Sequence, residues 1–161
     1  DKVAAHFLAA GLAHGRVLAI YAEKSALTYA SMLAALKIGA PYVVLDTESP
    51  AVRLEKILER AKPVLIAADR EFPLRGTTLV TFEALEAPIQ PAGESDEASG
   101  DSIAYLMFTS GSTGFPKGVA ISHASMMNFC DWSKRSFQIT PQDVLTGVNA
   151  LYFDNSVFDF T

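Results

Sequence analysis

The sequence predicts an α/β fold in which a parallel β-sheet is layered with helices. Three observations lead to this prediction. Short apolar runs of strand length recur, the segments between them carry apolar residues at helical spacing, and Gly or Pro stands at most junctions. Strands that are apolar on both faces are typical of parallel sheets covered by helices. The 161 residues, 50% of them hydrophobic, are enough for one globular domain or a large part of one.

Helices and strands alternate over the first part of the chain. Apolar residues at helical spacing predict a first helix, with Gly11 and Gly15 as stop signals. A later helix is expected to have Ser49 as its N-cap, Pro50 in its first turn and Arg53 on its solvated face. The elements predicted after the first helix are a strand at 17–21, a helix at 25–38, a strand at 42–45, a helix from about 49 to 61 and a strand at 64–67.

The second part of the chain is divided by a segment rich in Pro, Gly, Ser and acidic residues at about 88–101. We interpret it as an internal surface loop within one domain. A short strand at 78–82 precedes it, and strands at 103–108 and 119–121 and a helix at 122–137 follow. That helix carries Met126, Met127, Phe129 and Trp132, and a stripe of this kind is expected in the core.

Charge and composition exclude several classes of protein. The net charge is -5 and no run of Lys or Arg occurs, so no nucleic-acid partner is expected. The single cysteine, Cys130, cannot form an internal disulfide and is expected to be a small buried hydrophobe rather than a nucleophile. No apolar run reaches the roughly 18–20 residues of a membrane span, and no signal-peptide pattern is visible. We therefore expect a cytoplasmic protein with no membrane partner.

Residues 109–118 contain four hydroxyl side chains, three glycines and one lysine between two apolar strands. Glycines allow backbone N–H groups to approach a ligand, hydroxyls donate to phosphate oxygens, and Lys117 supplies a positive charge. The pattern therefore predicts a polyphosphate-binding loop. The residues expected to hold the phosphates are Thr109, Ser110, Gly111, Ser112, Thr113, Gly114 and Lys117.

This stretch is neither a P-loop nor a dinucleotide-binding loop. Counted from Gly111, the glycine that a P-loop requires before the lysine is replaced by Pro116, and Gly118 stands where Ser or Thr is needed. The G-x-G-x-x-G pattern is also absent from these residues. The alternative is a flexible Gly/Ser loop with an incidental lysine, but the ordered string between two strands favours phosphate binding.

The string TSGSTGFPKG at 109–118 resembles the signature loop of the adenylate-forming superfamily, which includes nonribosomal peptide synthetase adenylation domains, acyl-CoA synthetases and luciferases. Residues 36–46, with Pro50, Arg53 and Leu54, are similar to the LKAGxAYVPLD…P…RL region of the peptide synthetases. Val44 and Thr47 stand where that family often has proline, a difference that concerns a turn. The resemblance implies that residues 109–114 hold the β- and γ-phosphates of ATP and that Lys117 acts as the catalytic residue.

Residues 153–156 resemble the FDxS motif of the amino-acid-activating members. Asp154 is the position that binds the substrate's α-ammonium in that family; the alternative is a solvated or capping carboxylate. The family often has histidine at the position of His123, which we interpret as structural or capping rather than catalytic. Asp159 matches no motif and is expected to be structural. No metal ligand is assigned within the chain.

The resemblance implies ATP- and Mg²⁺-dependent activation of a carboxylic acid, an amino acid in the first instance, as acyl-AMP. The acceptor would be the phosphopantetheine thiol of a carrier protein. D-alanine–carrier-protein ligases and acyl- or aryl-CoA ligases are alternatives, and a non-catalytic nucleotide-binding fragment is an alternative of another class. Residues 1–161 would form a partial N-terminal adenylation domain without the C-terminal subdomain. We expect enzyme activity from the full-length parent and none from this chain alone.

Overall fold

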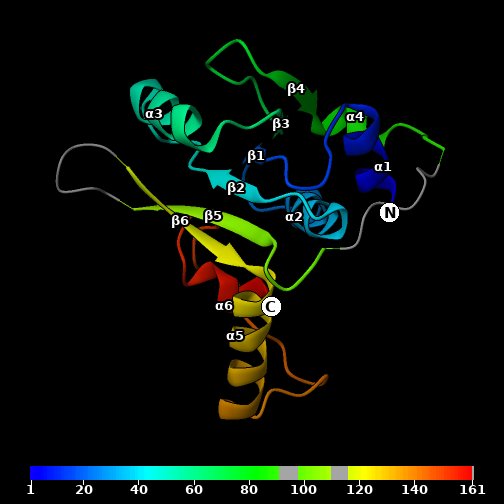
Figure 1. The fold of residues 1–161 in the computed structure, drawn as a ribbon. Coiled ribbons are helices and arrows are strands. Elements are labelled where there is room, and N and C mark those ends of the chain that lie inside the picture. The colour runs from blue at the N-terminus through cyan, green and yellow to red at the C-terminus, as the bar shows by residue number, and fades with distance from the viewer. Residues whose placement is uncertain (91–97, 110–115, 161) are drawn as a thin grey trace.

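The computed structural model describes residues 1–90, 98–109 and 116–160. A central sheet with the strand order β4-β3-β1-β2-β5-β6 organises these residues (Figure 1). Its strands are β1 (Leu18–Tyr21), β2 (Tyr42–Leu45), β3 (Leu65–Ala68), β4 (Thr78–Thr81), β5 (Ile103–Thr109) and β6 (Lys117–Ser122). The helices are α1 (Lys2–Ala9), α2 (Ala26–Ile38), α3 (Ala51–Ala61), α4 (Phe82–Glu86), α5 (His123–Ser136) and α6 (Ser156–Phe160).

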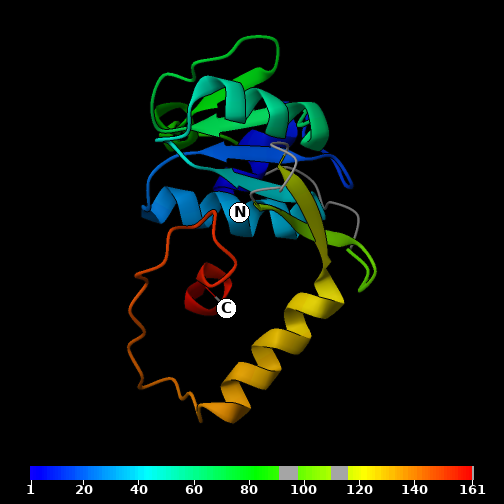
Figure 2. The ribbon, with the colours of Figure 1, turned by 90° about the vertical axis from the view of Figure 1, so that its left-hand side faces the viewer.

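Helices cover both faces of the sheet, because successive side chains of a strand point to opposite faces. Leu18 and Ile20 of β1 share one buried cluster with residues of α1, α2 and α6. Ala19 and Tyr21 share the other with residues of α3. In Figure 2, α2 and α3 accordingly lie on opposite sides of the sheet. The prediction of an α/β fold layered with helices is confirmed.

The direction of the last strand corrects the expectation of a wholly parallel sheet. β1 to β5 pair in parallel, but β6 pairs antiparallel with β5. The physical reason lies in the connection, since parallel neighbours need a crossover of about a dozen residues or more. The segment from Thr109 to Lys117 is too short for one, so the chain turns back beside itself.

Two local predictions were wrong. Ser49 does not cap α3: its hydroxyl donates to Asp46 Oδ2 at 3.0 Å, and Pro50 holds the N-cap position without a side-chain bond. Phe82, expected at the end of a strand, begins the short helix α4, because Thr81 Oγ1 accepts from the backbone N–H of Ala84 at 3.3 Å. The sequence also gave no signal for α6.

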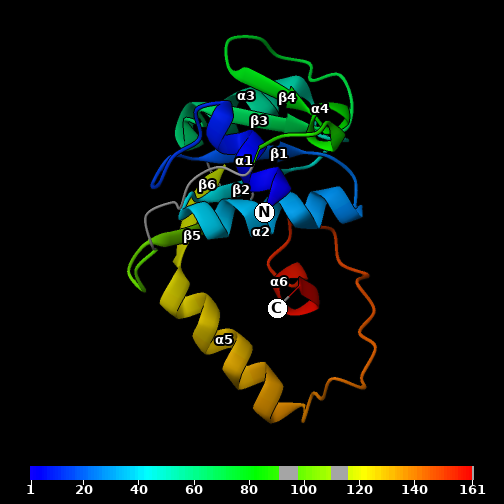
Figure 3. The same cartoon turned by 90° about the vertical axis from the view of Figure 1, so that its right-hand side faces the viewer.

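The helix α5 forms as predicted, with Ser122 Oγ accepting from the N–H of Ser125 at 3.2 Å. The expectation that its Met and aromatic stripe is core holds only in part. Met126 is buried, whereas Met127 and Trp132 are 58% and 50% exposed. Figures 2 and 3 show the reason: α5 runs away from the sheet, and only its N-terminal end lies close to it. Cys130 is half-buried and packs against the core.

Two further expectations concern exposure and membranes. Residues 91–97 of the expected surface loop lie outside the described residues, and its flanks at 88–90 and 98–101 are exposed or half-buried. Within the described ranges, no helix combines the length and apolarity that a bilayer crossing requires.

Candidate functional site

The ends of the predicted phosphate loop meet at the tip of the β5–β6 ribbon. Thr109, the last residue of β5, pairs in register with Lys117, the first residue of β6. Lys117 therefore belongs to a strand rather than to the loop itself. Both residues are exposed. The other residues proposed for phosphate binding, Ser110, Gly111, Ser112, Thr113 and Gly114, lie outside the described residues.

The register also determines which way Lys117 faces. Side chains at alternate positions of a strand share one face, so Lys117 lies on the face of Val119 and Ile121. Directly paired residues of an antiparallel ribbon also share a face, which adds Thr109 to this set. Val119, Ile121 and Thr109 all line a cavity. The ribbon thus directs Lys117 toward the side on which that cavity lies.

The cavity has a volume of about 740 Å³ and lies where β2 and β5 separate. The two strands share the single register pair Tyr42–Tyr105 in the described part of the chain, and the rings of this pair stack with centroids 5.8 Å apart. Val44 and Met107, each two residues further on, already line the cavity. It therefore opens toward the carboxyl ends of these strands, the usual position of ligand sites in α/β sheets.

The other walls come from α3 and from the segment before α6. Lys24 Nζ donates to Gly147 O at 2.5 Å, where the chain returns from α5 toward the sheet. Tyr152, Phe153 and Asp154 then follow along the cavity wall. The full lining is Val44, Asp46, Glu48, Ser49, Pro50, Arg53, Ile57, Tyr105, Met107, Phe108, Thr109, Val119, Ile121, Tyr152, Phe153 and Asp154.

The structure places Asp154 at the same cavity as Thr109, although 45 positions separate the two in the sequence. The Asp154 side chain is exposed, and its Oδ1 accepts from the N–H of Asn155 at 2.9 Å. Burial, and then the carboxylate of Asp154, raise the pKa of Tyr105, which also lines the cavity. The negative charge of Asp154 therefore acts on the cavity lining. A cationic group in the cavity would be stabilised by this carboxylate.

Three charged lining residues were missed by the sequence analysis. Asp46 and Glu48 follow β2, and Arg53 stands in the first turn of α3. Arg53 was expected on a solvated helix face; it is half-buried and lines the cavity instead. For Asp46 and Glu48 the available signal was their position just after a buried strand, because polar residues at the carboxyl ends of parallel strands converge on one edge of the sheet.

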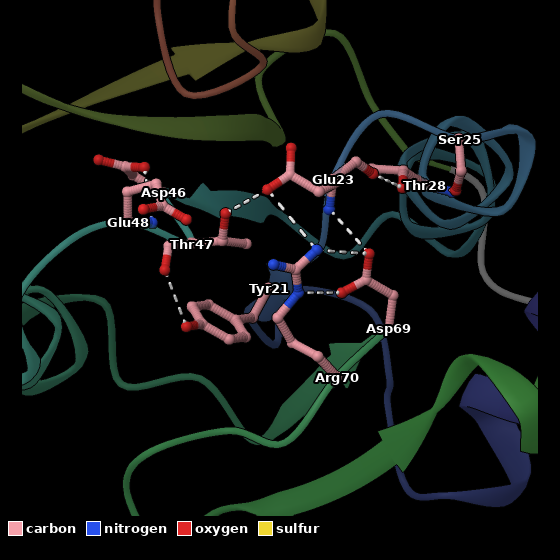
Figure 4. Close-up of polar contacts among 9 residues, drawn as sticks. All are labelled: Tyr21, Glu23, Ser25, Thr28, Asp46, Thr47, Glu48, Asp69 and Arg70. Carbon is pink, nitrogen blue, oxygen red and sulfur yellow. Dashed lines mark hydrogen bonds and ion pairs between the residues drawn. The ribbon is translucent and has the colours of Figure 1, made fainter.

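The loops after β1, β2 and β3 are joined beside this edge by a polar network (Figure 4). Arg70 lies 2.8 Å from Asp69 and 3.6 Å from Glu23, and Tyr21 donates to Thr47 O at 3.0 Å. Partial burial alone would raise the pKa of the Asp69 carboxyl. The overall pKa is lowered, because Asp69 accepts hydrogen bonds from Arg70 and from the backbone N–H of Glu23 and lies beside the charge of Arg70. The network fixes the strand ends from which Asp46 and Glu48 project.

Asp46 itself is held by its own turn. One carboxylate oxygen accepts from the N–H of Glu48 at 3.1 Å, and the other accepts from Ser49 Oγ at 3.0 Å. Among the described residues no group of three or more His, Cys, Asp or Glu side chains is arranged to hold a metal ion.

His123 lies at the start of α5, away from the cavity lining. Its backbone N–H donates to Ser102 O at 2.9 Å. The ring atom Nε2 is buried and has no hydrogen-bond partner in the described structure. Burial, and then the nearby His14, lower the pKa of His123. A position at a helix start agrees with a structural role.

Comparisons with known proteins agree over the whole chain. The model of the family described as AMP-binding enzyme matches residues 1–161. Pyochelin synthetase PchF from Pseudomonas aeruginosa is 35% identical over 93% of this chain and 8% of its own length. An L-proline--[L-prolyl-carrier protein] ligase from Streptomyces coelicolor is 34% identical over 99% of this chain and 35% of its own length. The chain therefore spans about a third or less of these relatives.

Solved structures show the same fold. The N-terminal subdomain of Klebsiella oxytoca NpsA, in complex with 3-hydroxybenzoyl-AMSN, has a TM-score of 0.86 at 26% identity and covers 99% of this chain and 41% of its own. The nonribosomal peptide synthetase FmoA3, bound to alpha-methyl-L-serine-AMP, has a TM-score of 0.88 at 27% identity and covers 99% of this chain and 18% of its own. The chain belongs to the AMP-binding enzyme family and is part of the N-terminal domain of a nonribosomal-peptide-synthetase-like adenylation domain.

Proposed function

We propose that this chain supplies part of the ATP-binding half of an enzyme that activates an amino acid as acyl-AMP and releases pyrophosphate. The observation that carries the proposal is the convergence of Thr109 and Asp154 on one cavity, with Lys117 paired to Thr109. Thr109 and Lys117 begin and end the loop proposed for phosphate binding, and Asp154 is the carboxylate proposed for the substrate ammonium. One cavity would thus hold both reactants.

In the proposed reaction, a carboxylate oxygen of the substrate attacks the α-phosphorus of ATP. The bond from that phosphorus to the oxygen bridging the α- and β-phosphates breaks, and pyrophosphate leaves with the bonding electrons. Catalysis of this kind depends on positioning and on stabilising the developing charge. We assign the stabilisation of the leaving pyrophosphate to Lys117 and the hydrogen bonds to phosphate oxygens to Thr109, Ser110, Gly111, Ser112, Thr113 and Gly114.

Mg²⁺ would share the phosphate charge. The described residues provide no dedicated three-ligand metal site. Mg²⁺ in nucleotide sites is held mainly by phosphates, water and one or two carboxylates.

The acyl substrate is proposed to be an amino acid because the cavity favours a cation near Asp154. Burial, and then the carboxylate of Asp154, raise the pKa of Tyr105, so the negative charge of Asp154 acts on the cavity lining. An ammonium group would be attracted there, and a plain acid would leave Asp154 without a partner.

The proposed acceptor is the phosphopantetheine thiol of a carrier protein. Its sulfur would attack the acyl carbonyl, form a thioester and displace AMP. The support comes from relatives: the Streptomyces coelicolor protein is named a carrier-protein ligase, and another solved neighbour is an artificially fused adenylation–PCP di-domain from Klebsiella oxytoca. We infer that the reaction takes place in the cytoplasm.

The test is amino-acid-dependent exchange of labelled pyrophosphate into ATP, measured on the intact protein that carries this chain. Lys117→Ala and Asp154→Asn would be compared with Lys134→Ala and Asp131→Asn, which change exposed residues of α5 outside the cavity lining. We expect exchange with one amino acid, weakened by the first pair and unchanged by the second.

Other outcomes would change the proposal in different ways. Exchange with acids that lack an amino group would favour an acyl- or aryl-CoA ligase and remove the role of Asp154. Exchange with D-alanine alone would favour a D-alanine–carrier-protein ligase. A folded intact protein with no exchange for any acid would favour a non-catalytic nucleotide-binding protein.

A further inference from the structure

We propose that Arg53 is an additional anion-binding residue of this site, which contacts the polyphosphate of ATP and the pyrophosphate formed from it. The inference rests on the proposed function and assigns a part of it to a residue outside the 109–118 stretch. It is carried by the position of Arg53 at the cavity and by the lack of any partner for its guanidinium among the described residues.

Arg53 reaches the cavity from α3, the helix that follows β2. It is half-buried and lines the cavity beside Ile57, one turn further along the same helix. Phe108 and Thr109, at the end of β5, line the same cavity, and α3 also contacts β6. Arg53 thus adds a cation to a cavity that also contains the first residue of the proposed phosphate loop.

The guanidinium has no anion to pair with in the described structure. No carboxylate in the described ranges lies within the 4 Å of an ion pair from it, although Asp46 and Glu48 line the same cavity. Asp46 is engaged instead by Ser49 and by the backbone of Glu48. Arg70, by contrast, pairs with Asp69 and Glu23. Partial burial of a cation without an anion is energetically unfavourable. An anionic ligand bound to the Arg53 guanidinium would offset this cost.

Arg53 does not stabilise the helix α3 by its position in the first turn. The N-terminal turn of a helix carries partial positive charge, which disfavours a further cation there. The first turn of α3 contains no acidic residue, and Pro50 gives no side-chain cap bond. A residue that opposes local stability at a cavity wall indicates a functional constraint.

The sheet places Arg53 and Lys117 on opposite faces at the end of β5. α3 packs on one face of the sheet with Phe108, and α6, which follows Asp154, packs on the other with Met107. Thr109 and Lys117 share the face of Met107, so Arg53 would approach a phosphate chain at the end of β5 from the face opposite to these two residues. A guanidinium forms bidentate hydrogen bonds with phosphate oxygens, a geometry that lysine does not reproduce.

The experiment is calorimetric titration of the intact protein with ATP, pyrophosphate and AMP. Arg53→Ala and Arg53→Lys would be compared with Arg60→Ala, an exposed arginine of the same helix outside the cavity lining. We expect Arg53→Ala to weaken ATP and pyrophosphate binding by about tenfold or more, as for a lost charge-assisted bond. AMP binding should change by less than about twofold, Arg53→Lys should recover part of the loss, and Arg60→Ala should match the unmodified protein.

Three results would overturn the inference. Unchanged ATP and pyrophosphate affinity in Arg53→Ala would mean that the arginine is structural. An equal loss for AMP would place its contact on the nucleoside monophosphate. A lowered melting temperature without rescue by Arg53→Lys would attribute the loss to folding. Lys117→Ala separates this inference from the proposed function: if it weakens exchange while Arg53→Ala does not, the function stands and the role of Arg53 falls. An intact protein that binds no ATP would remove both.

Discussion

Thr109 and Lys117 face each other as register partners at the tip of the β5–β6 ribbon. A direct pair in an antiparallel ribbon holds two side chains on one face, here the face with the cavity-lining residues Val119 and Ile121. The two ends of the proposed phosphate loop are therefore fixed by backbone pairing. This arrangement positions a hydroxyl and an ammonium without using either in packing, since both residues are exposed.

Lys117→Met should lower the rate of pyrophosphate exchange without lowering stability. The side chain is exposed, so its removal costs no packing, whereas the loss of one charge-stabilising donor typically lowers a rate by roughly 10²–10³-fold. Exchange kinetics and thermal unfolding of the intact protein would check both parts. A parallel fall in melting temperature would show instead that Lys117 holds the ribbon together.

Gly118→Ala should disturb the ribbon at its contact with Phe108. An added Cβ would lie 3.0 Å from Phe108 Cε1, tighter than an ordinary contact, so the ring would have to move by a few tenths of an ångström. Overpacking in a full core costs about 1–3 kcal/mol of unfolding free energy, and we expect a loss at or below the lower end here because Phe108 is only half-buried. Gly100→Ala is the matched control, because its Cβ would meet Ala124 Cβ at an ordinary 3.5 Å. Denaturant unfolding of both variants would decide; equal stability would contradict the prediction.

Removal of Arg70 should change how stability depends on pH in the acidic range. The pKa of Asp69 is lowered in the folded state, so its contribution to stability is present above the unfolded pKa of about 3.9 and is lost as the pH falls through the folded pKa. Arg70→Met should therefore be less stable than the unmodified protein near neutral pH, and the difference should shrink on acidification. Unfolding measured between pH 2 and 7, at low and high salt, would test this.

Salt provides the control for this prediction. The Arg70 pairs are partly exposed and should be screened, so the difference between the two proteins should also shrink at high ionic strength. A difference that is independent of both pH and salt would attribute the effect to the packing of the arginine stem.

The sequence predicted local structure well because periodicity is a local property. The strand at 42–45 was correct, and the helix at 25–38 was correct to within one residue, as its hydroxyl N-cap Ser25 and its glycine C-cap Gly39 are both present. The direction of β6 was missed because it depends on the length of a connection and not on composition. The stripe on α5 was expected in the core, but periodicity does not say what covers it, and Trp132 is exposed.

The site was predictable only as separate motifs. Thr109 and Lys117 were identified from one string, and Asp154 from another, but the cavity that Thr109 shares with Asp154 depends on the separation of β2 from β5. Arg53 was misplaced because its charged neighbours on α3 suggested a solvated face. Its position at the cavity follows from the same strand separation, which no local pattern records.

His123 should make stability fall as the pH drops through the range below neutrality. Burial and His14 lower its pKa in the folded state, so the unfolded chain takes up a proton more readily, near its usual pKa of about 6.5. Above that pH both states are neutral and no penalty exists; below it, stability decreases until the pH reaches the folded pKa. The Nε2 atom of the ring is buried and has no partner among the described residues, so a charged imidazolium would lack a hydrogen-bond acceptor there.

Two variants separate the causes of this pH dependence. His123→Asn removes the titrating group and should flatten the stability profile between about pH 5 and 7. His14→Gln removes the neighbouring charge but leaves the burial, so it should reduce the slope only in part, because burial is the larger cause. The histidine ring signals in an NMR titration would give the pKa directly. An apparent value at or above the usual one for His123 would show that the buried Nε2 finds a partner in solution and would remove the predicted slope.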